Sequence, residues 1–268
     1  MKKINFSKMV ATGNDFVVLD TRYSVPDTRY PVLAKKLCDR KIGIGADGML
    51  LIEKSKSADF RMRIFNPDGS EPDMCGNGSR CVALYAKNKK IAGTSMSIET
   101  GAGLLYAVAG KGKVKINMTE PKDIKLSMHL KHGAGTYKAH HINTGVPHVV
   151  FFVDDLDKID LDVLGRGIRY HSMFAPKGTN VNIARMKNRS SVSIRTYERG
   201  VEAETLACGT GSVACALISS LVKNIKPPVK VFTRGGELKI YFKPKYNKFY
   251  DVFLEGPARE VFSGKISI

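Results

Sequence analysis

An internal repeat constrains the fold of this chain more than any other feature of its sequence. The residues from Cys75 to Ser79 read Cys-Gly-Asn-Gly-Ser, and those from Cys208 to Ser212, 133 positions later, read Cys-Gly-Thr-Gly-Ser. Six of the ten residues that begin at each cysteine are identical. A segment that recurs in this way indicates two copies of one structural unit.

Two further pairs of segments show nearly the same spacing. Gly45-Ala46-Asp47 corresponds to Gly178-Thr179-Asn180 at an offset of 133, and Thr12-Gly13 corresponds to Thr144-Gly145 at an offset of 132. Three motifs in one order at nearly one spacing indicate a duplicated chain. Each copy would have the size of an ordinary domain.

Each copy is predicted to be rich in β-strands. Short apolar or alternating stretches dominate the chain, as at residues 60–65 and 148–153. Helices are predicted near residues 78–87 and 211–222, and the second carries no charge over the eleven residues from Ser212 to Val222. A helix that is apolar nearly all round is buried. The polar segment 120–135 is expected to form a flexible junction between the halves.

The predicted fold is therefore α+β, with two pseudo-symmetric β-rich half-domains. We expect an N-terminal half of residues 1–119, completed by a C-terminal strand of residues 258–268, and a C-terminal half of residues 120–257. If the copies pack about a pseudo-twofold axis, equivalent residues face one another across a cleft. Cys75 and Cys208 would then lie on its two sides.

The composition excludes several classes of protein. A hydrophobic content of 43% is sufficient for a substantial core. The five cysteines are odd in number and form no C-x-x-C pair, so neither a disulfide framework nor a structural zinc site is indicated. The sequence contains no apolar run of signal-peptide or membrane-spanning length. We expect a cytoplasmic protein without a membrane partner.

The net charge of +18 would suit a nucleic-acid partner. The lysines are spread over many short stretches, however, and they do not interleave with aromatic residues as in a groove that tracks a nucleic-acid strand. Solvated surface charge is therefore favoured, and no nucleic-acid partner is expected. A basic binding protein without catalysis is the alternative from another functional class, and salt-dependent DNA affinity would identify it.

The repeated cysteines are placed to carry activated thiols. Each Cys-Gly-x-Gly motif precedes a helical stretch, so the thiol lies where unpaired N–H groups and the positive end of the helix dipole stabilise an anion. Such surroundings lower the pKa of a cysteine. The glycines let the backbone approach a ligand, and the same N–H groups are suited to hold a carboxylate.

Two activated thiols on opposite sides of one ligand suit the inversion of a stereocentre that bears an acidic C–H. One thiolate removes the proton from one face while the opposite thiol delivers a proton to the other face. Because the α-proton of an amino acid is feebly acidic, its carboxylate must be held by preorganised dipoles in a site that excludes water. The repeat therefore predicts an amino-acid epimerase with Cys75 and Cys208 as acid and base, with no metal and no cofactor.

Other roles for the cysteines are open at this point. A buried structural role is common for cysteine, and we assign it to Cys38, Cys81 and Cys215. The repeated pair is less suited to that role, because its glycines expose the position. A nucleophilic Cys-His enzyme is the second alternative, but it leaves one Cys-Gly-x-Gly motif unexplained. Its histidine would be one of His140, His141 and His148.

The ordered set of motifs resembles the diaminopimelate epimerase family across nearly the whole chain. Each motif is weak by itself, and their common order makes the resemblance specific. The matching stretches are Gly13-Asn14-Asp15-Phe16, Gly43-Ile44-Gly45-Ala46-Asp47, Ile64-Phe65-Asn66-Pro67-Asp68-Gly69-Ser70-Glu71, Met74 to Arg80, Pro147-His148, Gly178-Thr179-Asn180-Val181-Asn182, Tyr197-Glu198-Arg199-Gly200 and Ala207 to Gly211.

The resemblance implies that each half is a curled sheet or barrel around a central helix, with the active site in the cleft between the halves. It implies interconversion of LL- and meso-diaminopimelate, on the route to lysine and peptidoglycan precursors. The implied partner is this small-molecule substrate, and a homodimer is a candidate assembly. Cys75 and Cys208 match the paired acid and base. The helix starts that would hold the carboxylate at the reacting centre are Gly76, Asn77, Gly209 and Thr210.

Further matched residues would serve the end of the substrate that does not react. Arg199 suits a carboxylate because a guanidinium binds it at two points. Glu198 would accept from an ammonium and lie near one thiol, while His148 would tune the other, so both are expected to modulate thiol pKa values. Neutral amides for orientation would come from Asn14, Asn66 and Asn180.

Each of these residues also has a common structural role. An asparagine more often holds a turn or a helix cap, and Glu198-Arg199 could be a surface ion pair of little energetic weight. Their place in the ordered set favours the functional role.

Two positions depart from the family pattern. Val146 precedes Pro147-His148 where an asparagine occurs, and Gly48 follows Asp47 where a glutamine occurs. Neither residue can form the side-chain hydrogen bond of an amide, which makes recognition at the distal end less sharp. Alternatives within the same structural group are a proline racemase-like enzyme and a phenazine-biosynthesis-type isomerase. A ring substrate with no second charged end would give Glu198-Arg199 little purpose.

Overall fold

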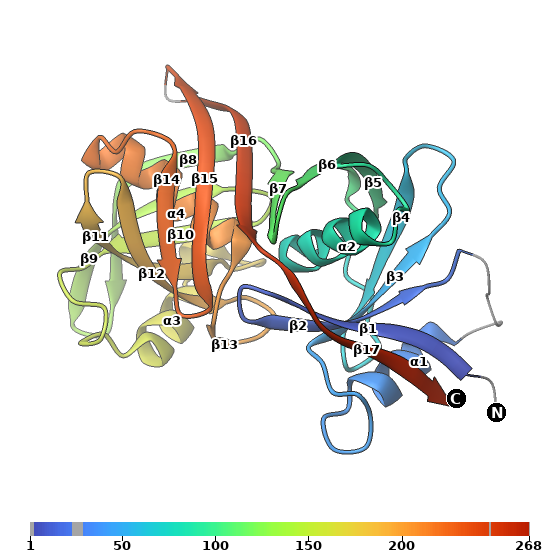
Figure 1. Ribbon diagram of the computed structural model, residues 1–268. Coiled ribbons are helices and arrows are strands. Elements are labelled where there is room, and N and C mark those ends of the chain that lie inside the picture. Colours follow the sequence, from blue (N-terminus) through green and yellow to red (C-terminus); the bar gives the residue numbers. More distant parts are fainter. Residues whose placement is uncertain (1–2, 23–28, 247, 268) are drawn as a thin grey trace. The chain divides into compact units, whose positions relative to one another are not determined.

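The computed structural model describes residues 3–22, 29–246 and 248–267, which divide into two compact units (Figure 1). The N-terminal unit comprises the described residues up to Asn117 together with those from Gly256 onward, and the C-terminal unit runs from Met118 to Glu255. Strands outnumber helices in both units. The predicted α+β class with two β-rich halves is confirmed.

In the N-terminal unit one curved sheet surrounds a helix. Its elements are β1 (Lys3–Ala11), β2 (Asn14–Asp20), α1 (Tyr30–Cys38), β3 (Gly48–Glu53), β4 (Phe60–Phe65), α2 (Gly76–Asn88), β5 (Ser95–Thr100), β6 (Gly103–Ala109), β7 (Lys113–Asn117) and β17 (Arg259–Ser267). The strands pair in the order β17-β1-β2-β3-β4-β5-β6-β7. The β2-β3 and β4-β5 pairs are parallel, and the other pairs are antiparallel.

The C-terminal unit repeats this arrangement. Its elements are β8 (Lys122–His132), β9 (Gly135–Asn143), β10 (Pro147–Phe152), α3 (Leu161–Arg169), a 3-10 turn (Ser172–Phe174), β11 (Asn180–Asn188), β12 (Ser191–Glu198), β13 (Ala203–Thr205), α4 (Gly209–Lys223), β14 (Val229–Thr233), β15 (Gly236–Lys245) and β16 (Lys248–Pro257). Its strands pair in the order β8-β9-β10-β11-β12-β14-β15-β16, with parallel pairs at the same two places, β10-β11 and β12-β14. The short β13 pairs with β12. The strand pairing of the two units therefore follows the duplication in the sequence.

The two predicted helices are the central helices of the two units. In the N-terminal unit α2 contacts β1, β2, β3, β4, β6, β7 and β17, and in the C-terminal unit α4 contacts β9, β10, β11, β12, β14 and β15. Every residue of α4 from Gly211 to Ser219 is buried, as expected for its uncharged sequence. Each fully buried Leu, Ile or Val in such a helix contributes about 1.5–3 kcal/mol of transfer free energy.

A second helix covers the outer face of each sheet. Met49 and Leu51 of β3 pack with α1, whereas the intervening Leu50 faces Gly78 of α2. The strand alternates its side chains between two buried faces, so it is apolar from Met49 to Ile52. In the C-terminal unit α3 packs on β11 and β12 in the equivalent way.

The prediction that residues 120–135 form a flexible junction is wrong. Residues 122–132 form β8, which pairs with β9 and adds Leu130 to the core beneath α3. Most of the strand is exposed, and its register shifts between Lys122 and Lys125 and again between Lys125 and Met128. The strand could not be recognised in the sequence, because its residues are mostly polar and the two register shifts interrupt the alternation of apolar and polar residues that is typical of a strand.

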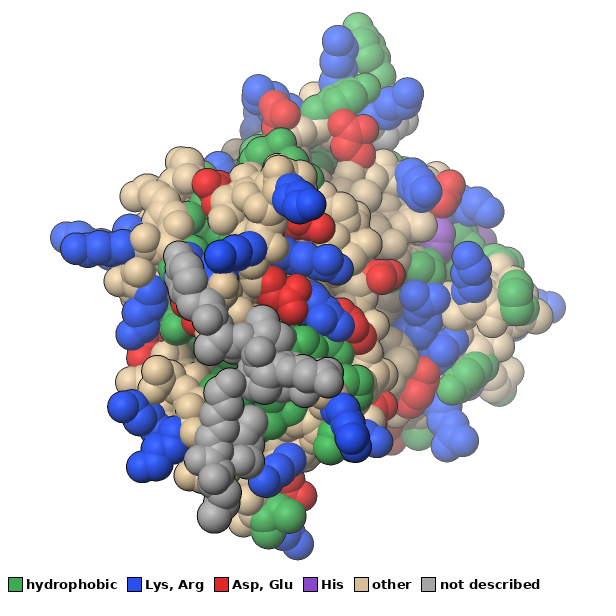
Figure 2. Space-filling view, turned by 90° about the vertical axis from the view of Figure 1, so that its right-hand side faces the viewer, with side chains coloured by type: hydrophobic (Ala, Val, Ile, Leu, Met, Phe, Trp, Pro, Cys, Tyr) green, Lys and Arg blue, Asp and Glu red, His purple; other side chains and the backbone are tan. Residues whose placement is uncertain are grey.

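The charged side chains are dispersed on the face shown in Figure 2. Lys and Arg lie among Asp and Glu over that surface, which agrees with solvated surface charge. In the part of the chain that the structure describes, no helix has the length and apolar character needed to cross a membrane.

Candidate active site

Cys75 caps the start of α2. Its backbone is extended, with φ −140° and ψ 119°, and the N–H of Gly78 donates to its Sγ at 3.4 Å. The hydroxyl of Ser79 donates to the carbonyl oxygen of Cys75 at 2.9 Å. The thiol therefore occupies the N-cap position, where the positive end of the helix dipole favours an anion.

Cys208 caps α4 with the same geometry. Its φ is −116° and its ψ is 119°, and the N–H of Gly211 donates to its Sγ at 3.4 Å. The hydroxyl of Ser212 donates to the carbonyl oxygen of Cys208 at 2.8 Å. The two helices begin directly after the repeated cysteines, as the sequence predicted.

The first residue of each helix is a glycine for which the protein's own packing gives no steric reason. A Cβ at Gly76 would have Ile116 Cδ1 as its nearest neighbour, at 3.8 Å, and a Cβ at Gly209 would have Leu254 Cδ1 at 3.4 Å. Both are ordinary contact distances. Because the first N–H groups of a helix lack partners within the helix, a bare backbone there leaves them open to an anionic ligand.

The third residue of each helix is a glycine for a different reason. A Cβ at Gly211 would lie 2.5 Å from Asn182 Oδ1, and a Cβ at Gly78 would lie 3.0 Å from Leu50 Cδ2. At these two positions, side chains of the sheet against which each helix packs leave little room for a Cβ atom. The first and third glycines of the motif are thus distinguished by their surroundings.

A buried hydrogen-bond chain leads to Cys208. Asn182 Nδ2 donates to the carbonyl oxygen of Val149 at 2.9 Å and lies 3.1 Å from Nδ1 of His148, while its Oδ1 accepts from Thr196. Because an amide nitrogen only donates, Nδ1 of His148 is the acceptor and Nε2 carries the proton. Nε2 then donates to Thr210 Oγ1.

The distances at the end of this chain are short. His148 Nε2 and Thr210 Oγ1 are 2.9 Å apart, and Thr210 Oγ1 lies 3.4 Å from Cys208 Sγ. Burial lowers the pKa of His148 to about 3, so the ring is neutral at physiological pH. A neutral imidazole that donates to Thr210 leaves the threonine hydroxyl proton directed at the sulfur.

Glu198 also reaches Cys208. Its carboxyl hydrogen-bonds Cys208 and accepts from Thr205 Oγ1 at 3.0 Å. Burial raises the pKa of this carboxyl, and the two hydrogen bonds oppose the rise. The sequence placed Glu198 and His148 at different thiols, whereas within the C-terminal unit both are connected to Cys208.

Asn180 and Arg199 are joined at the ends of β11 and β12. The N–H of Arg199 donates to Asn180 Oδ1 at 2.9 Å, and Asn180 Nδ2 donates to the carbonyl oxygen of Pro147 at 2.9 Å. Nη1 of Arg199 donates to the carbonyl oxygen of Lys177 at 3.3 Å. The amide of Asn180 therefore fixes the backbone from which the Arg199 guanidinium extends.

Two predicted residues of the N-terminal unit lie together at the start of α2. Asn77 Nδ2 donates to Asn14 Oδ1 at 2.6 Å, and Asn14 Nδ2 donates to Asp47 Oδ2 at 3.0 Å. Arg80 Nη2 donates to Asn77 Oδ1 at 2.7 Å. Each amide keeps one further N–H and one lone pair for a ligand.

Asn66 hydrogen-bonds within its own turn and not with the residues at the start of α2. Its Nδ2 donates to Ser70 Oγ at 2.9 Å, and its backbone N–H donates to the carbonyl oxygen of Ser70 at 2.8 Å. The side chain thus holds the turn after β4, which is the common structural role of an asparagine.

Sequence reasoning did not assign roles to Asn182 and Arg80. Asn182 lies two positions after Asn180 on β11, and this spacing is the signal that both side chains share one face. Arg80 is a cation in the buried part of α2, between Asn77 and Ala86, which is unusual enough to draw notice from the sequence. The other cysteines, Cys38, Cys81 and Cys215, are buried, and burial raises the pKa of each.

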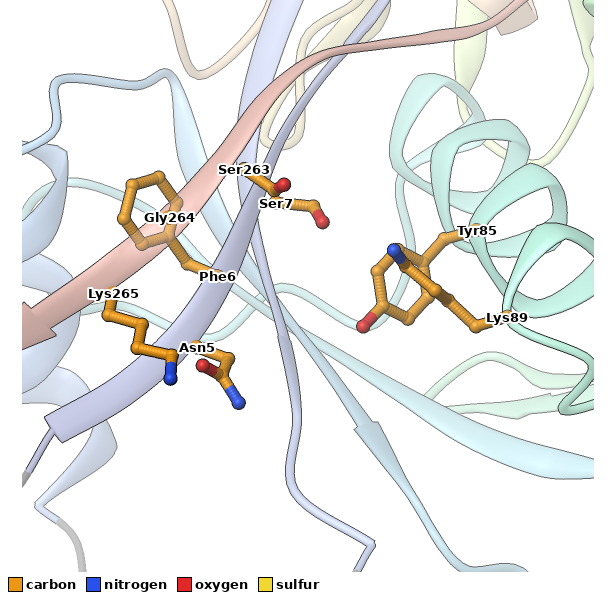
Figure 3. A pocket seen from close by; sticks show the side chains of 8 residues that line it. All are labelled: Asn5, Phe6, Ser7, Tyr85, Lys89, Ser263, Gly264 and Lys265. Atoms are coloured by element: carbon orange, nitrogen blue, oxygen red, sulfur yellow. The ribbon is translucent and has the colours of Figure 1, made fainter.

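In the part of the chain that the structure describes, no metal centre or large pocket competes with these residues. Within the described ranges, no cluster of three or more His, Cys, Asp or Glu side chains is arranged to hold a metal ion. A pocket of about 390 Å³ in the N-terminal unit is lined by Tyr85 and Lys89, near the end of α2 opposite Cys75, and by residues of β1 and β17 (Figure 3). None of the predicted site residues lines it.

Comparisons with known proteins agree on one family. The model of the diaminopimelate epimerase family matches residues 6–124 and 140–261. A diaminopimelate epimerase from a Hydrogenobaculum species is 43% identical over 97% of this chain and 98% of its own length. The diaminopimelate epimerase from Methanocella arvoryzae is 42% identical, over 100% of this chain and 98% of its own length.

Solved structures with the same fold have lower sequence identity. A phenazine biosynthesis protein from Bacillus anthracis covers all of both chains with a TM-score of 0.79 and 19% identity. A probable proline racemase from Agrobacterium radiobacter has a TM-score of 0.70 and 16% identity, over 99% of this chain and 93% of its own. These likenesses concern the fold alone. Because the family model spans most of the sequence and full-length relatives exceed 40% identity, the chain belongs to the diaminopimelate epimerase family.

Proposed function

We propose that this protein is an isomerase that interconverts LL- and meso-diaminopimelate by proton transfer at one α-carbon. The observation that carries the proposal is the repeated cap, in which Gly78 and Gly211 each donate a backbone N–H to the sulfur of Cys75 or Cys208 at 3.4 Å. A thiolate at an N-cap is stabilised by that N–H and by the helix dipole. The chain therefore offers two equivalent groups for one reaction that needs an acid and a base.

The proposed reaction uses both thiols on one substrate. One thiolate removes the α-proton and the other thiol delivers a proton to the opposite face, after which the charges on the two sulfurs are exchanged. The α-carboxylate would accept hydrogen bonds from the first N–H groups of the helices, next to Gly76-Asn77 and Gly209-Thr210. Negative charge that develops on the substrate in the transition state is stabilised there by fixed dipoles.

The distal end of the substrate would be bound without being changed. We assign its carboxylate to the guanidinium of Arg199, which Asn180 positions through the backbone. Asn14 and Asn77 have amide groups left for ligand hydrogen bonds. Asn66 would contribute to the substrate site through the turn that it holds. Glu198 and His148 would modulate the pKa of Cys208, because both are connected to that thiol.

The proposed reaction also indicates a biosynthetic pathway and a cofactor requirement. Epimerisation of diaminopimelate serves lysine and peptidoglycan precursor biosynthesis, which takes place in the cytoplasm. We infer no cofactor, because two thiols and the helix dipoles supply the acid, the base and the electrostatic stabilisation. A homodimer is the assembly that we propose to test by light scattering.

The decisive experiment is isotope exchange. Reduced enzyme incubated with LL-diaminopimelate in deuterated water should form the meso isomer with deuterium at one α-carbon, detected by mass spectrometry and chiral chromatography. Proline and single-centre amino acids, tested in parallel, separate this substrate from those of other two-thiol enzymes. Lack of exchange with diaminopimelate, or faster exchange with proline, would contradict the proposal.

Variants of the cysteines test the mechanism. Cys75→Ala and Cys208→Ala should each abolish epimerisation, because the remaining thiol cannot serve both faces. Cys38→Ala is the matched control, since Cys38 packs in the core between α1 and the sheet. Full turnover by either of the first two variants would eliminate the two-thiol mechanism.

A further inference from the structure

Arg80 is a buried cation that the proposed reaction does not yet use. It lies on α2, five positions after Cys75, and its side chain is fully buried. Nη2 donates to Thr12 Oγ1 and to Asn77 Oδ1, each at 2.7 Å, and Nη1 donates to the carbonyl oxygen of Gly76 at 3.5 Å. Its Nε is buried without a hydrogen-bond partner among the described residues.

The partners of this guanidinium are all uncharged. In the part of the chain that the structure describes, Arg80 forms no ion pair with an aspartate or a glutamate, whereas the partly buried Arg195 lies 2.7 Å from Glu204. Burial lowers the pKa of Arg80 to about 10, which still leaves it protonated at neutral pH. A buried cation without an anion is costly, so the site should gain stability when an anion forms nearby.

Arg80 also ends a chain of hydrogen bonds with a defined direction. Its Nη2 donates to Asn77, Asn77 donates to Asn14, and Asn14 donates to Asp47. A cation at one end and a carboxylate at the other fix which way both amides point, because each carbonyl oxygen must face a donor. The guanidinium therefore positions Asn77, which lies two residues after the cap residue Cys75.

The central helix of the C-terminal unit has a neutral residue in place of this cation. At the offset of 133 that relates the two caps, the position of Arg80 corresponds to Val213. Cys208 instead hydrogen-bonds Glu198, and His148, which is joined to it through Thr210, is neutral. The two thiols thus have the same backbone cap, but α2 carries a buried cation five positions after its cap, whereas Cys208 has a carboxyl group as a hydrogen-bond partner.

We propose that Arg80 is a positioning residue that favours the thiolate of Cys75, so that Cys75 is the base and Cys208 the acid in the substrate-free enzyme. This inference rests on the proposed function, in which each thiol takes both roles during turnover. The cation acts through its field and through Asn77, and it does not itself transfer a proton.

Other titratable groups near the start of α2 leave this asymmetry intact. The thiols of Cys75 and Cys81 both act electrostatically on Arg80. Burial raises the pKa of Cys81, which keeps its thiol neutral at physiological pH. Asp73, the acidic residue closest to Cys75 in the sequence, is exposed and lies against Gly101.

Alkylation of the two cysteines tests the proposal without substrate. Reduced wild-type enzyme is treated with iodoacetamide between pH 5 and pH 10, and the peptides that contain Cys75 and Cys208 are quantified by mass spectrometry. The plateau rate reports access to each sulfur, and the pH at half-maximal rate reports its protonation. The half-maximal pH of Cys75 should lie below that of Cys208.

Variants of Arg80 isolate the effect of its charge. Arg80→Met should reduce the alkylation rate of Cys75 at pH 7 by about tenfold and leave that of Cys208 unchanged, because about one pH unit of the shift is lost. Arg80→Lys should retain most of the wild-type rate. Arg61→Met removes a partly exposed arginine from β4 of the same unit and should leave both rates unchanged.

The outcomes separate the two proposals. A folded Arg80→Met variant whose Cys75 reacts at the wild-type rate overturns the role of Arg80. If that variant does not fold, the pH dependence of alkylation in the wild-type enzyme is the test. A half-maximal pH for Cys75 equal to or above that for Cys208 then overturns the role of Arg80. Because alkylation needs no substrate, an inactive enzyme with the expected rate difference would reject diaminopimelate as substrate and leave Arg80 in its role.

Discussion

Nε2 of His148 lies 2.9 Å from Oγ1 of Thr210, the second residue of α4. The two residues come from different elements, and their contact connects a neutral imidazole to the cap of the helix. Thr210 Oγ1 is also 3.4 Å from the sulfur of Cys208. Because the hydroxyl oxygen accepts from His148, its own proton is oriented toward the sulfur.

Removing the hydroxyl of Thr210 should slow the reaction. In Thr210→Val the donor to the Cys208 thiolate is lost, and a hydrogen bond to a charged group contributes about 1.5–3 kcal/mol, so kcat should fall by about 10- to 100-fold. Thr210→Ser keeps the hydroxyl and should retain most of the activity. Steady-state rates with LL-diaminopimelate measure both, and a wild-type kcat in Thr210→Val would exclude the hydroxyl from the mechanism.

The burial of His148 should make the protein less stable in acid. Its pKa is lowered from the ordinary value of 6.5 to about 3, so between these values the unfolded chain binds a proton that the folded protein excludes. The stabilising contribution is complete above pH 6.5 and is lost as the pH falls toward 3, by about 1.4 kcal/mol per pH unit.

A variant isolates this titration from that of other groups. Urea unfolding at pH 7, 6, 5 and 4 should show a free energy of unfolding that falls more steeply in wild type than in His148→Gln. His140, whose pKa is lowered mainly by burial, titrates in both proteins and cancels in the difference. Parallel pH dependences would contradict a neutral buried His148.

The first and third glycines of the caps should respond differently to a methyl group. Gly209→Ala places a Cβ at an ordinary 3.4 Å from Leu254 Cδ1, so the melting temperature should stay near that of wild type while kcat/KM falls. Gly211→Ala places a Cβ at 2.5 Å from Asn182 Oδ1. That clash should lower the melting temperature and, through Asn182, disturb His148. Calorimetry and rate measurements on the two variants make the comparison, and equal loss of stability would refute it.

Arg199 should govern the affinity for the distal carboxylate. In Arg199→Lys a point charge replaces a guanidinium that binds at two points, so KM for diaminopimelate should rise by about tenfold or more with a smaller change in kcat. Arg189→Lys makes the same change at an exposed position of the same unit and serves as the control. An unchanged KM in Arg199→Lys would show that another residue binds the distal carboxylate.

The sequence predicted the parts of the protein that depend on local pattern. The repeated Cys-Gly-x-Gly motif specifies a helix start by itself, because a cap residue and the glycines that follow act on their own backbone. Strands such as β4 were readable because their apolar residues alternate in register with a buried face. β8 was misread because two irregularities interrupt its alternation and most of its side chains are exposed.

The tertiary structure decided which distant residues meet at each thiol. The parallel pairing of β10 with β11 places Asn182 beside His148, 34 positions earlier in the chain, and this contact fixes the tautomer of the imidazole. The uncharged partners of Arg80 likewise come from the turn between β1 and β2 and from the start of α2. Duplication in the sequence determined that two similar caps exist. The exchange of Arg80 for Val213 is also written in the sequence. The burial of Arg80, and the approach of His148 and Glu198 to Cys208, depend on the tertiary structure, which a linear pattern does not contain.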